Sequence, residues 1–241
     1  MKTRAGVCLF AAVIAAALDA FAGVNLIRNG RFEGAGSQDA SWGAYANHAT
    51  FQCDAWEFLK PGRAGLCKPS STWTKMNAAA IGPFALFIQT HNDGECVVQQ
   101  SLGALAAGTY RVSFTFSTRS VKNGNVTTYI ELVEAGGAVT EVGVAQTAET
   151  GEILFLAEVT IPVGTYTFRF RQPQTGTDRA NIFEDVVVEQ LDARIGDTLY
   201  TFHEALERAA EGDTVVLDTD AQGNATIDGW TVTWPWDTAG K

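Results

Sequence analysis

Between residues 23 and 191 the chain alternates apolar and polar residues over short stretches, which predicts β-strands. Residues 110–117 and 166–171 alternate without interruption, as expected for strands that bury one face. Each of these strands is introduced by Gly-Thr-Tyr and follows an apolar run, Val97–Leu105 for the first and Ile153–Val163 for the second. The pattern therefore predicts two similar strand–turn–strand units.

Four more short runs have strand character and are separated by Gly-rich or polar turns. These are Ala85–Thr90, Thr127–Glu134, Glu141–Gln146 and Asn181–Gln190. No helical periodicity interrupts the region. Many short strands with turns between them predict an all-β fold, specifically an antiparallel β-sandwich of the jelly-roll type.

The pattern changes at about Asp192. Thr201-Phe-His-Glu204 is a capping box, which is typical of the start of a helix. One apolar helical face follows, Gly212 is placed to end it, and strand-like runs occupy residues 213–217 and 225–232. We therefore expect a short helix-plus-strand appendage over residues 192–241.

The first 22 residues have the organisation of a signal peptide. Lys2 and Arg4 precede the apolar run Val7–Leu18, and Ala20-Phe21-Ala22 forms an A-x-A cleavage site before Gly23. The apolar run is shorter than the roughly 20 residues that cross a bilayer. The sequence thus predicts a secreted, extracellular or cell-surface protein without membrane insertion.

Acidic side chains outnumber basic ones. The full chain has 17 Lys and Arg against 27 Asp and Glu, and cleavage would remove two basic residues and one acidic residue, leaving 15 and 26. Such a chain repels phosphate backbones, which argues against nucleic acid as a partner. It is equally unsuited to acidic polysaccharides, so the charge favours a neutral glycan.

Three cysteines remain after the predicted cleavage: Cys53, Cys67 and Cys96. Export permits a disulfide, but an odd number leaves one thiol over. A Cys53–Cys67 bond would close the shortest loop, and the other pairings stay open.

Residues 25–33 read Asn-Leu-Ile-Arg-Asn-Gly-Arg-Phe-Glu, a first strand broken by an Asn-Gly turn. This resembles the opening of secreted jelly-roll modules of the galactose-binding-like and carbohydrate-binding-module group, and the resemblance covers residues 23–191. It implies a glycan ligand. It also implies a structural Ca²⁺ held by Glu33, after the first strand, and Asp185, in the last strand.

The tail carries a second resemblance. Residues 211–217 read Glu-Gly-Asp-Thr-Val-Val-Leu after the expected helix, which resembles the entry of a right-handed parallel β-helix of the pectin-lyase-like kind. A single β-helix rung cannot bury its apolar face alone. Residues 192–241 are therefore expected to be the start of a truncated β-helix.

Sugar binding needs flat aromatic faces for stacking and planar hydrogen-bonding groups at their edge. The long segment Ser37–Asn77 offers aromatic candidates, and the polar sides of the two Gly-Thr-Tyr strands are expected to form one binding surface with them. The candidates for this surface are Trp42, Tyr45, Trp56, Trp73, Arg119, Tyr129 and Arg171. For each tryptophan the alternative is a core position, and for each arginine it is a solvated strand face.

The opening at residues 25–33, the paired Gly-Thr-Tyr strands and the early aromatic residues favour a secreted carbohydrate-binding module. We expect it to be non-catalytic, because the chain has no G-x-S-x-G, H-E-x-x-H or P-loop motif. One alternative is a structural or adhesive cell-surface protein whose sandwich is a spacer or docks to other cell-surface proteins. The other is a polysaccharide-active enzyme that has been truncated.

Overall fold

A computed structural model describes 11 segments of the chain. They comprise residues 25–32, 53–59, 63–67, 84–90, 94–118, 126–146, 151–174, 179–210, 213–217, 225–227 and 230–232. The predicted signal peptide, residues 1–22, lies outside them. The chain divides into two compact units, one formed by residues 26–107 and 111–188 and the other by residues 1–25, 108–110 and 189–241.

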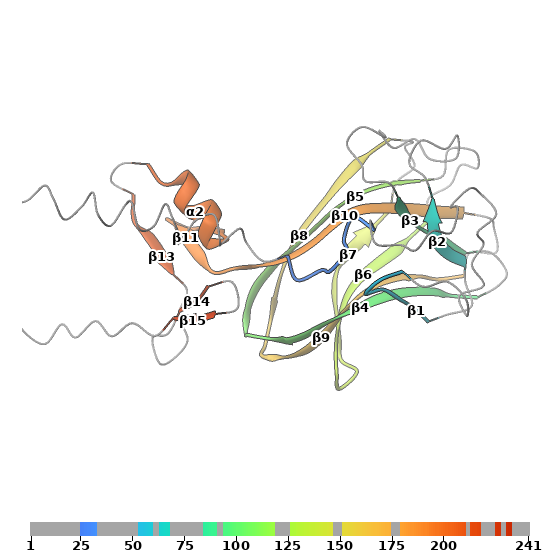
Figure 1. Cartoon of the computed structure of the whole chain (residues 1–241), viewed down its shortest axis with the longest axis horizontal. Coiled ribbons are helices and arrows are strands. Elements are labelled where there is room, and N and C mark those ends of the chain that lie inside the picture. The colour runs from blue at the N-terminus through green and yellow to red at the C-terminus, as the bar shows by residue number, and fades with distance from the viewer. Residues whose placement is uncertain are drawn as a thin grey trace, which may run out of the picture. The chain divides into compact units, whose positions relative to one another are not determined.

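Within the described residues, two five-stranded antiparallel sheets form a β-sandwich, and Figure 1 shows them as two layers. The first sheet has the order β1 (Glu57–Phe58), β4 (Cys96–Leu105), β9 (Gly164–Gln172), β6 (Thr128–Glu134) and β7 (Val139–Ala145). The second sheet has the order β2 (Arg63–Cys67), β3 (Ala85–Thr90), β10 (Arg179–Leu191), β5 (Gly108–Thr118) and β8 (Ile153–Ile161). The predicted all-β sandwich is confirmed.

The two Gly-Thr-Tyr strands lie in different sheets. The connection from β4 to β5 crosses from the first sheet to the second, and the connection from β8 to β9 crosses back. Each strand turns its apolar side toward the opposite sheet, so the polar sides of β5 and β9 face away from each other. The expectation that these polar sides form one binding surface is therefore wrong.

Aromatic rings fill the space between the sheets. The ring centroids of Phe170 on β9 and Phe183 on β10 are 4.5 Å apart, and Phe114 on β5 meets both rings edge-on. Trp56 packs on the same cluster, with its ring centroid 6.1 Å from that of Phe170. Large buried rings in edge-to-face contact supply much of the apolar burial that stabilises a sandwich.

The opening segment 25–32 forms turns along β10 and is not a strand. The N–H of Leu26 donates to the Val188 carbonyl, and the N–H of Val186 donates to the Gly30 carbonyl. A Cβ on Gly30 would lie 2.1 Å from the Val186 carbonyl oxygen, so only glycine permits this approach. The Asn-Gly turn thus serves close backbone packing.

The second unit contains the short three-stranded sheet β12 (Thr198–Tyr200), β11 (Ala193–Ile195) and β13 (Val215–Leu217), with helix α2 (Phe202–Arg208). The predicted capping box is present, because Thr201 and Glu204 each accept a hydrogen bond from the other's backbone N–H. A separate hairpin joins β14 (Ala225–Ile227) and β15 (Trp230–Val232).

In the second unit, β11 pairs antiparallel with β12 and with β13, and β14 pairs antiparallel with β15. The rungs of a parallel β-helix pair in parallel instead. The β-helix identity of residues 192–241 therefore stays a prediction. No helix within the described segments is long and apolar enough to cross a membrane.

Candidate ligand-binding site

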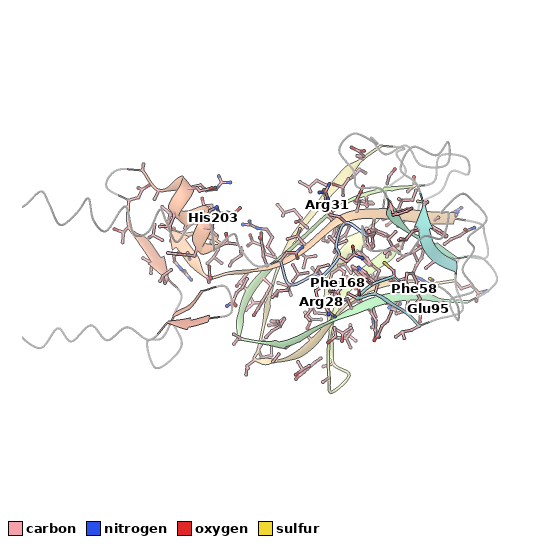
Figure 2. The ribbon with its side chains drawn as sticks, in the orientation of Figure 1. Arg28, Arg31, Phe58, Glu95, Phe168 and His203 are labelled. Carbon is pink, nitrogen blue, oxygen red and sulfur yellow. The ribbon has the colours of Figure 1, made fainter. Side chains whose placement is uncertain are left out.

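The outer face of the first sheet is organised around β9, which lies between β4 and β6. Phe168 and Phe170 are fully buried and point into the core, where Figure 2 labels Phe168 among the packed side chains. Alternation along the strand then places Thr167, Arg169 and Arg171 on the opposite, outer face.

Strand register gathers the outward side chains into two rows that cross the strands. The stacking row is Leu59, Val97, Arg171, Tyr129 and Val144. The polar row is Glu57, Gln99, Arg169, Glu131 and Glu141. A β-bulge between Ile130 and Glu131 lets both Val144 and Glu141 of β7 join this face.

Glu131 is the centre of an ion-pair network on this face. Its Oε2 accepts from Nε and Nη2 of Arg169, both at 2.6 Å, and its Oε1 accepts from Nε of Arg171 at 2.8 Å. Nη1 of Arg171 also reaches Oε2 of Glu95 at 3.4 Å. Figure 2 places Glu95 on the side of β1 and β4. Each guanidinium is therefore held in one orientation.

Arg171 also stacks on the aromatic side chain opposite it. Its Cζ lies 4.4 Å from the centroid of the Tyr129 ring. Burial by itself would lower the pKa of Arg171, but the hydrogen bonds and charges of Glu131 and Glu95 raise it. The guanidinium is thus a permanent cation that is fixed by an anion on one side and a π-face on the other.

The two rows offer complementary chemistry. Leu59 and Val144 are exposed at opposite ends of the stacking row, and Tyr129 lies next to Val144, so the row offers apolar side chains and one aromatic ring. In the polar row, Nε2 of Gln99 donates to Oε2 of Glu57 at 3.0 Å, which orients this amide as Glu131 orients the arginines. The result is a strip for C–H surfaces beside an ordered set of hydrogen-bonding groups.

Of the predicted ligand-binding residues, the structure brings Tyr129 and Arg171 together on this face. The predicted ligand-binding role of Trp56 is wrong, because this residue is 5% exposed and its ring packs against Phe32, Phe168 and Phe170. Its Nε1 donates to the Asn29 carbonyl at 3.1 Å. Trp56 is therefore a core residue and cannot offer a face to a sugar. Four candidates lie outside the described residues: Trp42, Tyr45, Trp73 and Arg119.

Sequence reasoning did not single out Glu131, Gln99 or Glu95. The available signal was the alternation Tyr129-Ile-Glu131-Leu within a strand, which marks Glu131 as facing away from the core. Its contact with the two arginines depends on the register between β6 and β9, and register cannot be read from either strand alone.

The three cysteines are all buried free thiols, so the Cys53–Cys67 disulfide is not formed. Cys53 forms an isolated antiparallel β-bridge with Trp56 just before β1, whereas Cys67 ends β2 in the other sheet. Burial first, and the charge of Asp54 second, raise the pKa of Cys53 to about 12. A buried neutral thiol behaves here as a small apolar side chain.

The calcium expectation rests on Glu33 and Asp185. Glu33 lies outside the described residues, and Oδ1 of Asp185 lies 3.1 Å from Nε of Arg31. Calcium takes about six to eight oxygen ligands, and no group of three His, Cys, Asp or Glu gathers within the described segments. Because Glu33 lies outside the described residues, calcium stays a prediction.

No family model matches the chain, and a search of curated proteins finds no match. Among solved structures, it is similar to TmCBM61 in complex with β-1,4-galactotriose, with 16% identity, coverage of 69% of this chain and 99% of that chain, and a TM-score of 0.43. It is also similar to the CBM22-1 xylan-binding domain of Paenibacillus barcinonensis Xyn10C. That match has 8% identity and a TM-score of 0.48, and it covers 70% of this chain and 96% of that chain.

A catalytic protein is also among the similar structures. The arabinose-bound α-L-arabinofuranosidase MgGH51 matches with 14% identity and a TM-score of 0.46 over 58% of this chain. The chain spans only 23% of that enzyme's length. At these TM-scores the matches do not establish a function, and the fold assignment rests on the strand pairing itself.

Proposed function

We propose that this chain is a secreted, non-catalytic carbohydrate-binding protein whose site is the outer face of β1, β4, β9, β6 and β7. The observation that carries the proposal is the pairing of the stacking row with the polar row. A sugar ring has C–H patches that stack on apolar and aromatic groups, and hydroxyls at its edge that need fixed donors and acceptors. The opening resemblance at residues 25–33 supports the same class of ligand.

We propose that the ligand is a neutral polysaccharide or glycan. Four carboxylates on or beside this face outnumber its two guanidiniums: Glu57, Glu95, Glu131 and Glu141 against Arg169 and Arg171. An anionic polymer would meet net negative charge there, which disfavours its approach.

Binding, and not hydrolysis, fits the state of the central carboxylate. Glycoside hydrolysis uses a pair of carboxyl groups as acid and base or nucleophile. Both oxygens of Glu131 already accept hydrogen bonds from arginines. A carboxylate so engaged is not available for proton transfer to a sugar.

The test is a glycan array with the secreted form of the protein, followed by calorimetry on the best neutral ligand. Arg169→Gln should weaken binding about tenfold, because it removes a charge-assisted donor from the site. The matched control is Arg111→Gln, since Arg111 pairs with Glu158 on the outer face of the other sheet. Equal losses in both variants, or no neutral glycan bound at all, would remove the proposal.

The structural or adhesive alternative and the truncated-enzyme alternative predict different results in the same experiments. An adhesive spacer would bind no glycan, and an enzyme would release reducing ends from its ligand. The calcium prediction is checked separately, by comparing the thermal unfolding midpoint in calcium chloride with that in EDTA.

A further inference from the structure

Glu131 occupies an unusual position for a carboxylate. It points to the outer face of the first sheet, yet its side chain is only 3% exposed because the two arginines cover it. Arg169 and Arg171 remain 21% and 27% exposed. The anion therefore lies beneath the cations, and a ligand on this face would meet the guanidiniums first.

Glu131 forms hydrogen bonds with only some of the guanidinium nitrogens of the two arginines. It accepts from Nε and Nη2 of Arg169 and from Nε of Arg171. Nη1 of Arg169 and Nη2 of Arg171 form no hydrogen bond or ion pair with a described residue, so these N–H donors are available to a ligand. They can donate hydrogen bonds to sugar hydroxyls while the Glu131 carboxylate neutralises the positive charge of the guanidiniums.

Removing the negative charge of Glu131 would change the class of ligand that the site accepts. Arg169 has no other carboxylate partner among the described residues, and Arg171 would keep only the 3.4 Å contact with Glu95. Two neighbouring guanidiniums without a counterion form a favourable site for a carboxylate, which pairs with arginine through two parallel hydrogen bonds.

We propose that Glu131 determines the charge class of the glycan: it neutralises Arg169 and Arg171 so that their outward N–H groups bind neutral sugars and do not retain uronic acids. This inference rests on the proposed function. Glu131 acts through the arginines and is a positioning residue. Its replacement should create a new specificity as well as weaken an existing one.

The experiment uses the neutral oligosaccharide selected by the array and the same oligosaccharide after oxidation of its primary hydroxyls to carboxylates. Glu131→Gln should raise the affinity for the oxidised ligand about tenfold, because one compensating charge near the guanidiniums is lost. The gain should shrink as sodium chloride is added, since partly exposed charges are screened.

Glu158→Gln is the matched control. Glu158 is partly exposed and pairs with Arg111 on the outer face of the other sheet, away from the proposed site. Its replacement makes the same change in net charge, but it should leave the preference for the neutral ligand unchanged. A similar gain in Glu158→Gln would mean that overall charge sets the preference, and the proposal would fail.

Circular dichroism first shows whether Glu131→Gln is folded. If it is folded and prefers the neutral ligand as strongly as the parent protein does, the inference is wrong. If it does not fold, Glu95→Gln decides, because it also removes an anion from Arg171 and should give a smaller gain for the oxidised ligand. Absence of that gain overturns the inference. A parent protein that binds neither ligand overturns the proposed function instead.

Discussion

The guanidinium of Arg171 covers one face of the Tyr129 ring, with 4.4 Å between Cζ and the ring centroid. The two residues are direct cross-strand partners on β9 and β6. Such a pair holds both side chains in place before any ligand arrives, which lowers the conformational entropy lost on binding. The aromatic side chain of the site is thus fixed by the same arginine that offers hydrogen bonds.

Tyr129→Ala should weaken binding of the neutral ligand about tenfold, because it removes the ring plane and loosens Arg171. Tyr129→Phe keeps the ring and should stay within about threefold of the parent protein. Isothermal titration calorimetry measures both. Equal losses in the two variants would show that the hydroxyl, and not the ring, contacts the ligand.

Trp56→Ala should lower the free energy of unfolding by about 3–5 kcal/mol, as expected when a large core side chain leaves a cavity. The reason is its burial against Phe168 and Phe170. Urea denaturation measures the change. Trp56→Phe should lose less, and the fraction that remains folded should bind glycan with the parent affinity. Unchanged stability in Trp56→Ala would contradict the core position.

The strand content of the sandwich could be predicted because alternation reports burial directly. Residues 110–117 and 166–171 fall within β5 and β9, and the capping box at Thr201 starts helix α2 as expected. Sheet membership could not be predicted, because the connections before β5 and β9 do not show whether the chain continues in one sheet or crosses to the other. That difference separated two strands that look alike in sequence.

The site was predictable only in part for the same reason. Tyr129 and Arg171 carry the residue types that sugars need, so chemistry alone nominated them. Glu131 gains its role from the β6–β9 register, which is a long-range property of the fold. Trp56 has the right residue type but the wrong location, because its ring is needed between the sheets.

Stability should fall as the pH rises above 9.0, in part because of Cys53. Its pKa is raised from 9.0 to about 12 in the folded chain, so the folded thiol stays neutral while the unfolded thiol ionises. This contribution is complete below pH 9.0 and is lost progressively toward pH 12. Urea unfolding of Cys53→Ala at pH values on either side of 9.0 should show a shallower decline than the parent protein. An identical decline would contradict the burial of this thiol.

Thr201→Ala should destabilise the second unit by about 1 kcal/mol, because the capping box with Glu204 satisfies two backbone N–H groups at the start of α2. Hydrogen exchange of the α2 amides measures this loss. Glu207→Gln is the control, since Glu207 pairs with His203 on the helix surface and should change stability by less than about 0.5 kcal/mol. Unchanged exchange in Thr201→Ala would refute the cap.

The most direct measurement is a crystal structure of residues 23–241 with the array-selected neutral oligosaccharide bound. The ligand should lie on the outer face of β4, β9 and β6, with a sugar ring against Tyr129 and hydroxyls within hydrogen-bonding distance of Arg169 and Arg171. An oligosaccharide bound instead to the outer face of β5 and β8, or away from both arginines, would contradict the account.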